Sequence, residues 1–595
     1  MCLQKNIKII GKYPNLATNI HRITDPQLKF EYQSRVTQAM KAHFNPSEVK
    51  KIHEGFRRSQ WSEEAFKTDI DKLDSDYFEV TKDEHYHKAI DTIKRQFFTP
   101  EKKLRPVHYA DLRHYPWELS TNVGAPYNTA PKWKEYVHRK YQNVTEGRPF
   151  DEQFERDLFA EAHKGQSLLP EMLKANMSKR NLYNETFFMD REKIHRIKDG
   201  YKTTKTGHDY KYWHSAFARL HLVEEEDPDK VRLVFGAPWL SIKAEAMFIW
   251  PIQAWLMSQG ENSPLLWGYE TLTGGWYRLR NYFHRKFRHH TSILTADWSG
   301  FDRRARHTVI SDIHSEILRP MFTFEEGYHP TQDYPTSKSE SYDPQRLENL
   351  WNWMTEAVLK TPLLMHNGDM LEFQHSGIYS GYLQTQLLDS IYNMVMIYST
   401  LFRLGFKESE IALKVQGDDS VIALKAHYVL TEHWLIPEFE RLALKHFGAV
   451  LSTKKTEYHS SWEHVEVLKY RNENGLPYRD GLTLMAQLYH PEGSLTLSAL
   501  KARAIGIAYA AVGRDLRVFR TCEDIFNSLP DVEVGSSLKH QPDQIQFLVK
   551  YLRFDIELDR FPLIYETVNR LMDERHSLPS TRYWPTSHFI GLPGQ

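Results

Sequence analysis

The sequence predicts an α+β fold, with helical segments towards both ends of the chain and short strands between them. Residues 1 to about 190 are rich in charged and aromatic residues at helical spacing, and the helical pattern returns after about Gly475. Between these regions, two runs of strand-forming residues, Ile411–Val415 and Val421–Leu424, flank a Gly-Asp-Asp turn. Helices and antiparallel strands are therefore both expected.

Length and composition exclude several classes of protein. A chain of 595 residues, 41% of them hydrophobic, is too long for a small binding module and predicts about three or four packed subregions. Lys plus Arg and Asp plus Glu both number 77, so any nucleic-acid binding must come from local clusters of charge. Two cysteines cannot form a disulfide framework.

No segment has the character of a membrane span or a secretion signal. The longest apolar stretch, Ala237–Met257, is interrupted by Lys243, Glu245 and Gln253. The N-terminus lacks an apolar core followed by a small-residue cleavage site. We therefore expect a soluble intracellular protein with no membrane partner.

The first chemical signal is a pair of acids after a short strand. The strand-like run Ile293–Ala296 leads directly to Asp297, and Asp302 follows five residues later. Taken alone, this pair is weak evidence for a metal site, and an ordinary strand end followed by an acid that caps the next helix explains it better.

The second signal is Asp418 and Asp419 at the tip of the predicted hairpin. Two adjacent carboxylates in such a turn repel each other unless cations meet them, although Asp and Gly are also common turn residues. Combined with Asp297, they form a metal-binding hypothesis, because hard carboxylate oxygens suit Mg²⁺ or Mn²⁺.

A helix is predicted between these two blocks, from about Leu383 to Tyr398. Its apolar residues recur at helical spacing, while Thr385, Asp389 and Asn393 fall on one polar stripe. These short hydrogen-bonding side chains could contact a ribose hydroxyl. Further on, helices are predicted over Leu500–Gly513 and Gln544–Leu558 and from Leu563, whereas residues 320–347 are predicted to be a loop.

These motifs and their order resemble the viral RNA-dependent RNA polymerases, most closely those of partitiviruses, which are double-stranded RNA viruses of plants and fungi. DWSGFD (Asp297–Asp302), SGYLQTQLLDSIYN (Ser380–Asn393) and QGDDS (Gln416–Ser420) resemble motifs A, B and C of that family. Many plus-strand virus polymerases have Asn where this chain has Asp389. Weaker likenesses are DKVRLVFGAPW to motif F, STNVGAPY to motif G, STKKTEY to motif D and VEVLKYRNENGLPYRD to motif E.

The resemblance implies a right-hand polymerase, with a palm sheet that bears the metal acids, a mostly helical thumb, and fingers closed by their tips. It implies the following division of the chain: 1–240, N-terminal region and fingers; 241–312, first palm part with adjoining fingers; 313–375, fingers insertion; 376–475, second palm part; 476–595, thumb and C-terminal region.

The resemblance also implies a role for each motif residue. Asp297 and Asp418 would bind two Mg²⁺ ions, which Mn²⁺ can replace, with Asp419 as a helper nearer the surface. Lys455, or its neighbour Lys454, would protonate the leaving pyrophosphate. The remaining residues would bind the nucleotide: the triphosphate through Lys230 and Arg232, and the ribose through Asp302, Ser380, Thr385 and Asn393.

The resemblance implies synthesis of RNA on an RNA template from ribonucleoside triphosphates, in the host cytoplasm and inside a virion, with capsid protein as a partner. Two alternatives are a reverse transcriptase and a non-catalytic RNA-binding virion protein. The first commonly has a bulky aromatic residue where this chain has Asp302, and Tyr or Phe where it has Gly417.

Overall fold

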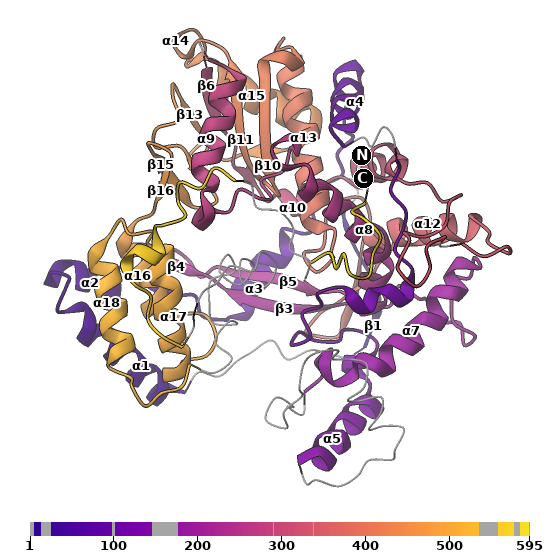
Figure 1. The fold of residues 1–595 in the computed structure, drawn as a ribbon, viewed down its shortest axis with the longest axis horizontal. Helices are drawn as coiled ribbons and strands as arrows, with labels where there is room; N and C mark the ends of the chain where they lie inside the picture. The colour runs from indigo at the N-terminus through magenta and orange to yellow at the C-terminus, as the bar shows by residue number, and fades with distance from the viewer. Residues whose placement is uncertain are drawn as a thin grey trace.

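The computed structural model describes residues 5–13, 25–97, 102–145, 176–288, 291–336, 338–534, 557, 559–575 and 583–593. In this part of the chain, two larger sheets are surrounded by helices (Figure 1). The expected α+β class is therefore confirmed. No helix among the described residues is long and apolar enough to cross a membrane.

A four-stranded antiparallel sheet carries the predicted hairpin. Its strand order is β10-β11-β6-β13, with β10 at Ile411–Gln416, β11 at Asp419–Lys425, β6 at Thr291–Thr295 and β13 at Glu457–His459. Side chains alternate between its two faces, as the period of a strand requires. One face shares a core with α13 (Thr385–Arg403) and α15 (Leu435–Phe447), and the other with α9 (Gly275–Lys286).

A five-stranded sheet lies next to the first one. Its order is β1-β9-β8-β3-β5, with β1 at Ile7–Lys12, β9 at Asp369–Phe373, β8 at Leu363–Leu364, β3 at His214–Leu220 and β5 at Val231–Gly236. The chain leaves β5 and enters α8 (Trp239–Ser258), which is buried on nearly all sides between α7 (Tyr183–Lys198) and α12 (Gln345–Lys360). The long apolar stretch is therefore a core helix.

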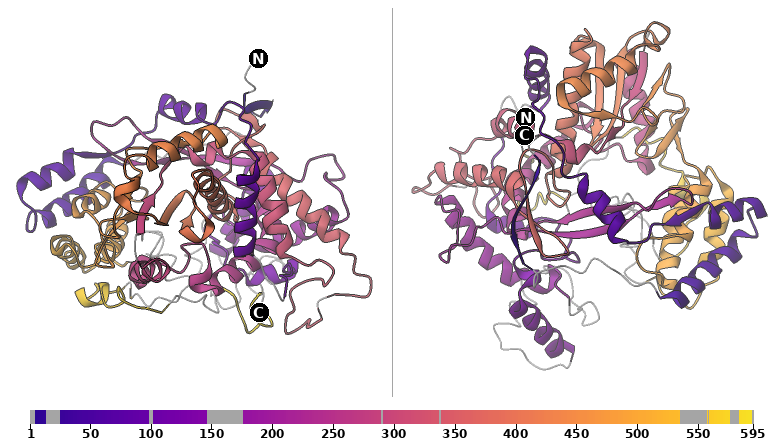
Figure 2. Two further views of the ribbon diagram at one scale, coloured as in Figure 1. Left: turned by 90° about the horizontal axis from the view of Figure 1, so that it is seen from above. Right: turned by 180° about the vertical axis from the view of Figure 1, so that it is seen from behind.

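Helices from the two ends of the chain share one core. They are α1 (Pro26–Met40), α2 (Pro46–Glu54), α16 (Gly481–Tyr489), α17 (Leu497–Ala510) and α18 (Leu516–Asn527). Tyr32 and Val36 of α1 are fully buried against the same cluster as Leu484 and Cys522. Figure 1, and the view from behind in Figure 2, show these five helices as one group. The domain boundaries expected from the sequence stay predictions, but α1 and α2 lie with the residues assigned to the thumb.

The remaining helices and strands complete the described fold. The helices are α3 (Glu63–Asp71), α4 (Glu84–Phe97), α5 (Pro131–Thr145), α10 (Phe301–Arg304), α11 (His307–Asp312) and α14 (Tyr428–Thr431). The strands are β2 (Phe56–Arg58), β4 (Leu222–Glu224), β7 (Trp298–Ser299), β12 (Val450–Leu451), β14 (Glu466–Val467), β15 (Tyr470–Glu473) and β16 (Leu476–Tyr478).

The helix predictions near the C-terminus have different outcomes. The helix over Leu500–Gly513 is confirmed as α17. The helix predicted from Leu563 is wrong, because only a 3-10 turn forms there, at Ile564–Thr567, and the chain then bends away. The helix predicted over 544–558 lies almost entirely outside the described residues.

Candidate active site

Nearly all of the predicted site residues line one cavity, which we call the site cavity. Its volume is about 1330 Å³. It lies between the acid-bearing edge of the four-stranded sheet, the start of α13, and β5. Its lining includes every predicted site residue except Asn393: Lys230, Arg232, Asp297, Asp302, Ser380, Thr385, Asp418, Asp419 and Lys455.

The backbone at Asp297 is held by the turn that follows β12. The Asp297 N–H donates to the Thr456 hydroxyl at 3.2 Å, and its carbonyl accepts from the Ser452 N–H at 2.8 Å. Leu451 of β12 pairs with Trp298 immediately after this acid. The Asp297 side chain therefore projects from a backbone fixed on both sides.

The Gly-Asp-Asp turn is held by α13. The Gly417 N–H donates to the Ser390 hydroxyl at 2.8 Å. The Asn393 amide donates to the carbonyls of Gly417 and Asp418, at 3.1 and 3.0 Å, and accepts from the indole N–H of Trp298 at 2.9 Å. The helix thus ties the two acid-bearing segments together.

The structure therefore does not bring Asn393 to the site cavity with the other residues predicted to contact the ribose. Its side chain is fully buried, both ends of its amide are used, and it does not line the site cavity. Sequence reasoning missed Ser390 altogether. The available signal was that Ser390 and Asn393 are short polar residues three positions apart, which places them on one side of the helix.

The two hydroxyl residues before and at the start of α13 do reach the cavity. Thr385 lines it while donating its hydroxyl hydrogen to the Tyr379 carbonyl at 2.5 Å, which leaves the oxygen free to accept. Ser380 is exposed, and its hydroxyl accepts weakly from the Phe235 N–H at 3.4 Å. Both hydroxyls remain available to a ligand.

The carboxyl groups in the cavity repel one another. Burial, followed by the nearby Asp302, raises the pKa of Asp418. Burial, with Asp418 and Asp297 as neighbours, raises the pKa of Asp419 to about 6. Asp389 is buried, and burial together with Asp302 raises its pKa well above the ordinary value. A cation would relieve this repulsion.

The donor set fits a hard divalent cation, although the acids do not form a closed metal cage. Among the residues that the structure describes, no group of three or more His, Cys, Asp or Glu side chains is already arranged to hold a metal ion. However, Asp297, Asp418 and Asp419 line the same cavity with carboxylate oxygens, the donors that Mg²⁺ and Mn²⁺ prefer.

Three cations line the same cavity as these acids. Burial lowers the pKa of Lys230, and the charges of Arg232 and Lys455 lower it further, so the three side chains lie within electrostatic reach of one another. The charge of Arg232 partly offsets the rise in the pKa of Asp418. Of the two adjacent lysines, Lys455 lines the cavity and Lys454 does not.

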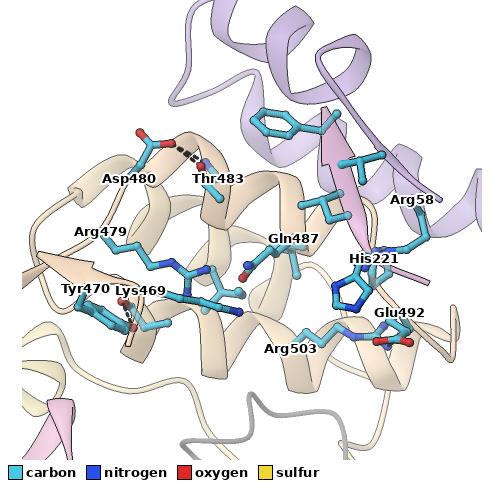
Figure 3. A pocket seen from close by; sticks show the side chains of 18 of the residues that line it. Arg58, His221, Lys469, Tyr470, Arg479, Asp480, Thr483, Gln487, Glu492 and Arg503 are labelled. Atoms are coloured by element: carbon cyan, nitrogen blue, oxygen red, sulfur yellow. Dashed lines mark hydrogen bonds between the residues drawn. The ribbon is translucent and has the colours of Figure 1, made fainter. Parts of the chain in front are cut away.

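A second cavity, of about 1790 Å³, is continuous with the site cavity, since Arg219, Lys230, Arg232 and Leu468 line both. Nine Lys and Arg residues line it against six Asp and Glu residues, so its lining is positively charged overall. Figure 3 shows Arg58, His221 and Arg503 towards one end and Lys469 and Arg479 towards the other. Sequence reasoning found part of this lining, namely Lys230, Arg232 and the segment 465–480.

Comparison with known proteins agrees with this geometry. The family described as viral RNA-dependent RNA polymerase matches residues 172–522. The RNA-directed RNA polymerase of White clover cryptic virus 1 is 31% identical over 623 aligned residues, which cover 99% of this chain and 97% of that protein. The RNA-directed RNA polymerase of Atkinsonella hypoxylon virus is 26% identical over 508 residues, 77% of this chain and 70% of that protein.

These matches set aside the two alternatives that the sequence left open, a reverse transcriptase and a non-catalytic RNA-binding protein. Residues 172–522 contain the acids, the cations and the α13 contacts described above. This chain belongs to the viral RNA-dependent RNA polymerase family.

Proposed function

We propose that this polymerase extends RNA by two-metal-ion nucleotidyl transfer in the site cavity, with Asp297 and Asp418 as the metal ligands and Asp419 as a helper. The observation that carries this proposal is that the three acids and three cations line one cavity although they come from four separate segments. Two Mg²⁺ ions, or Mn²⁺ in their place, would supply charge that activates the 3′-hydroxyl and stabilises the leaving pyrophosphate.

Arg232 and Lys230 would bind the triphosphate of the incoming nucleotide. A guanidinium presents several N–H groups to phosphate oxygens, whereas an ammonium acts as a point charge. Lys455 would donate a proton to the pyrophosphate as the phosphoanhydride bond breaks. Its place in the cavity supports it over Lys454.

Asp302, Ser380 and Thr385 would recognise the ribose. All three line the site cavity, and Ser380 and Thr385 have hydroxyl oxygens that can accept a hydrogen bond. A site that hydrogen-bonds a hydroxyl discriminates strongly against a substrate that lacks one. The buried Asn393 has no part in this recognition and instead holds the catalytic turn.

The second cavity would hold an RNA strand next to the reaction centre. Its excess of cations and its continuity with the site cavity support this role, because a groove of positive charge follows a phosphate backbone. In a right-hand arrangement the four-stranded sheet would be the palm, α16–α18 would belong to the thumb, and β3 and β5 to the fingers.

Replacing Lys469 and Arg479 by Gln tests this RNA path. Removing one cation that binds a phosphate should reduce the slope of log affinity against log salt by roughly 0.7 to 0.9. An unchanged slope for both variants would exclude these residues from the RNA path.

We also propose, on the family resemblance alone, that the enzyme works inside a virion in the host cytoplasm beside capsid protein. Absence of polymerase from purified virions would refute this.

The metal assignment is tested by Asp297→Asn and Asp418→Asn, each assayed for nucleotide incorporation on an RNA template with Mg²⁺. Each variant should lose RNA synthesis while keeping its fold, because a metal ligand and not core volume is removed. Glu340→Gln, at an exposed acid away from both cavities, is the control and should retain full activity. A folded Asp297→Asn or Asp418→Asn variant with near wild-type rate would refute the assignment.

A further inference from the structure

The loop that leads into α13 is capped by a residue of another helix. Gln384, at the N-cap of α13, makes no side-chain capping bond of its own. Instead, the backbone N–H groups of Leu383 and Gln384 both donate to the carboxylate of Glu245, in α8, the second at 3.3 Å. A carboxylate at this end of a helix satisfies free N–H groups and is favoured by the helix dipole.

A hydrogen-bonded chain orients this carboxylate. The Gln384 side-chain amide donates to Glu245 at 2.8 Å, which leaves its carbonyl oxygen to accept from His314 Nε2, also at 2.8 Å. Glu245 is 1% exposed and has no cation among these partners. A buried carboxylate whose oxygens accept three N–H bonds is held in one geometry.

The same loop faces the site cavity. Ser380, Leu383 and Thr385 line that cavity, while Glu245 lies behind them in the core. The other side of the loop is pressed against β5, because a Cβ atom at Gly381 would lie 2.3 Å from the Phe235 carbonyl oxygen. The loop is thus fixed between β5 and the Glu245 carboxylate.

We propose that Glu245 is a positioning residue for nucleotide selection, because its carboxylate fixes the loop that presents Ser380 and Thr385 to the incoming nucleotide. This inference rests on the ribose-binding role proposed above for that loop. Glu245 itself touches neither nucleotide nor metal. It acts through the backbone of Leu383 and Gln384.

The test is Glu245→Gln, which keeps the size of the side chain but replaces one acceptor oxygen with an NH₂ group that only donates. Because one hydrogen bond between buried groups is removed, KM for ribonucleotides should rise about tenfold, and the ratio of ribonucleotide to deoxyribonucleotide kcat/KM should fall. A purely structural defect would reduce the active fraction and lower kcat for both substrates, leaving KM and the ratio unchanged.

Lys243→Met is the matched control. Lys243 lies on the same helix, is equally buried, and pairs with Asp190 at 3.0 Å away from the loop. Breaking this ion pair should reduce stability while KM and the substrate ratio stay at wild-type values. A Lys243→Met variant that changed KM as much as Glu245→Gln would refute a specific role for Glu245.

Gln384→Met decides the matter if Glu245→Gln does not fold. It removes only the amide that orients Glu245 and leaves the two backbone bonds, so it should change KM and the ratio in the same direction, about threefold. Wild-type KM and ratio in the folded variants would refute the positioning role. The ribose-binding proposal is tested separately, by Asp302→Ala, Ser380→Ala and Thr385→Ala. It would fail if the wild-type protein made RNA and all three variants kept the wild-type ratio of ribonucleotide to deoxyribonucleotide kcat/KM.

Discussion

Asn393→Ala should separate the role that the structure assigns to this residue from the ribose-binding role that the sequence predicted. The Asn393 side chain makes three hydrogen bonds in a fully buried position, to Trp298, Gly417 and Asp418. The variant leaves one donor and two acceptors without partners, at about 1–3 kcal/mol for each buried group. We therefore expect the free energy of unfolding to fall by roughly 3 kcal/mol or more.

The catalytic effect should be equal for all nucleotides. Because Asn393 positions the turn that carries Asp418, its loss should lower kcat for ribonucleotides and deoxyribonucleotides by the same factor. Single-nucleotide incorporation with both substrates measures this effect. Asp302→Ala is the comparison variant, in which the ratio of ribonucleotide to deoxyribonucleotide kcat/KM is expected to fall. Ser399→Ala is the stability control, since Ser399 is equally buried on α13 but its hydroxyl has no hydrogen-bond partner among the residues that the structure describes. A changed ratio with kcat retained in Asn393→Ala would refute our reasoning.

Three further predictions follow from the charges in the site cavity. Arg232→Lys should raise KM for nucleoside triphosphates roughly tenfold, because an ammonium group cannot bind phosphate oxygens in a bidentate manner; an unchanged KM would make Arg232 structural. Lys455→Leu should lower single-turnover rate about 100-fold without weakening nucleotide binding, whereas Lys454→Leu should not; the reverse result would move the general acid by one residue. Because the pKa of Asp419 is raised to about 6 in the folded state, its contribution to metal-free stability is present at low pH and is lost as pH rises through about 6. Mg²⁺ should bind more weakly below this pH. Asp419→Asn should remove the pH dependence of metal-free stability, measured by denaturation, and that of Mg²⁺ affinity, measured by titration. A wild-type pH profile in that variant would exclude Asp419 as the titrating group.

Local patterns in the sequence predicted the elements that carry the chemistry. The hairpin over Ile411–Leu424 and the α13 helix were predictable because each depends on a period of two or 3.6 residues within one short segment. The face of α13 was predictable, but the reach of each side chain was not. Asn393 lies eight residues after Thr385, and therefore about 12 Å further along the helix axis. At that distance it is under the catalytic turn and not beside the ribose-facing loop.

The partners in contacts between distant segments could not be identified from the sequence. Glu245 and Leu383 are 138 residues apart, and a single buried Glu in an apolar stretch was noted only as an interruption of a membrane span. Such a residue must find a partner in the core, because an unpaired buried carboxylate is strongly unfavourable. A charged residue within an apolar helix therefore predicts that a partner exists, although it does not say where.

The equal numbers of acidic and basic residues likewise did not predict how charge is distributed in the folded protein. Four of the seven arginines of the second cavity lie far apart in the sequence: Arg58 in β2, Arg219 in β3, Arg479 directly after β16 and Arg503 in α17. The fold brings them together because α1 and α2 pack on the C-terminal helices, and Arg58 donates to the carbonyls of Leu220 and His490 across the join. Net charge could exclude a chain that is basic throughout. It could not exclude a cavity that is basic within a neutral protein, because the packing of remote segments decides which charges face each other.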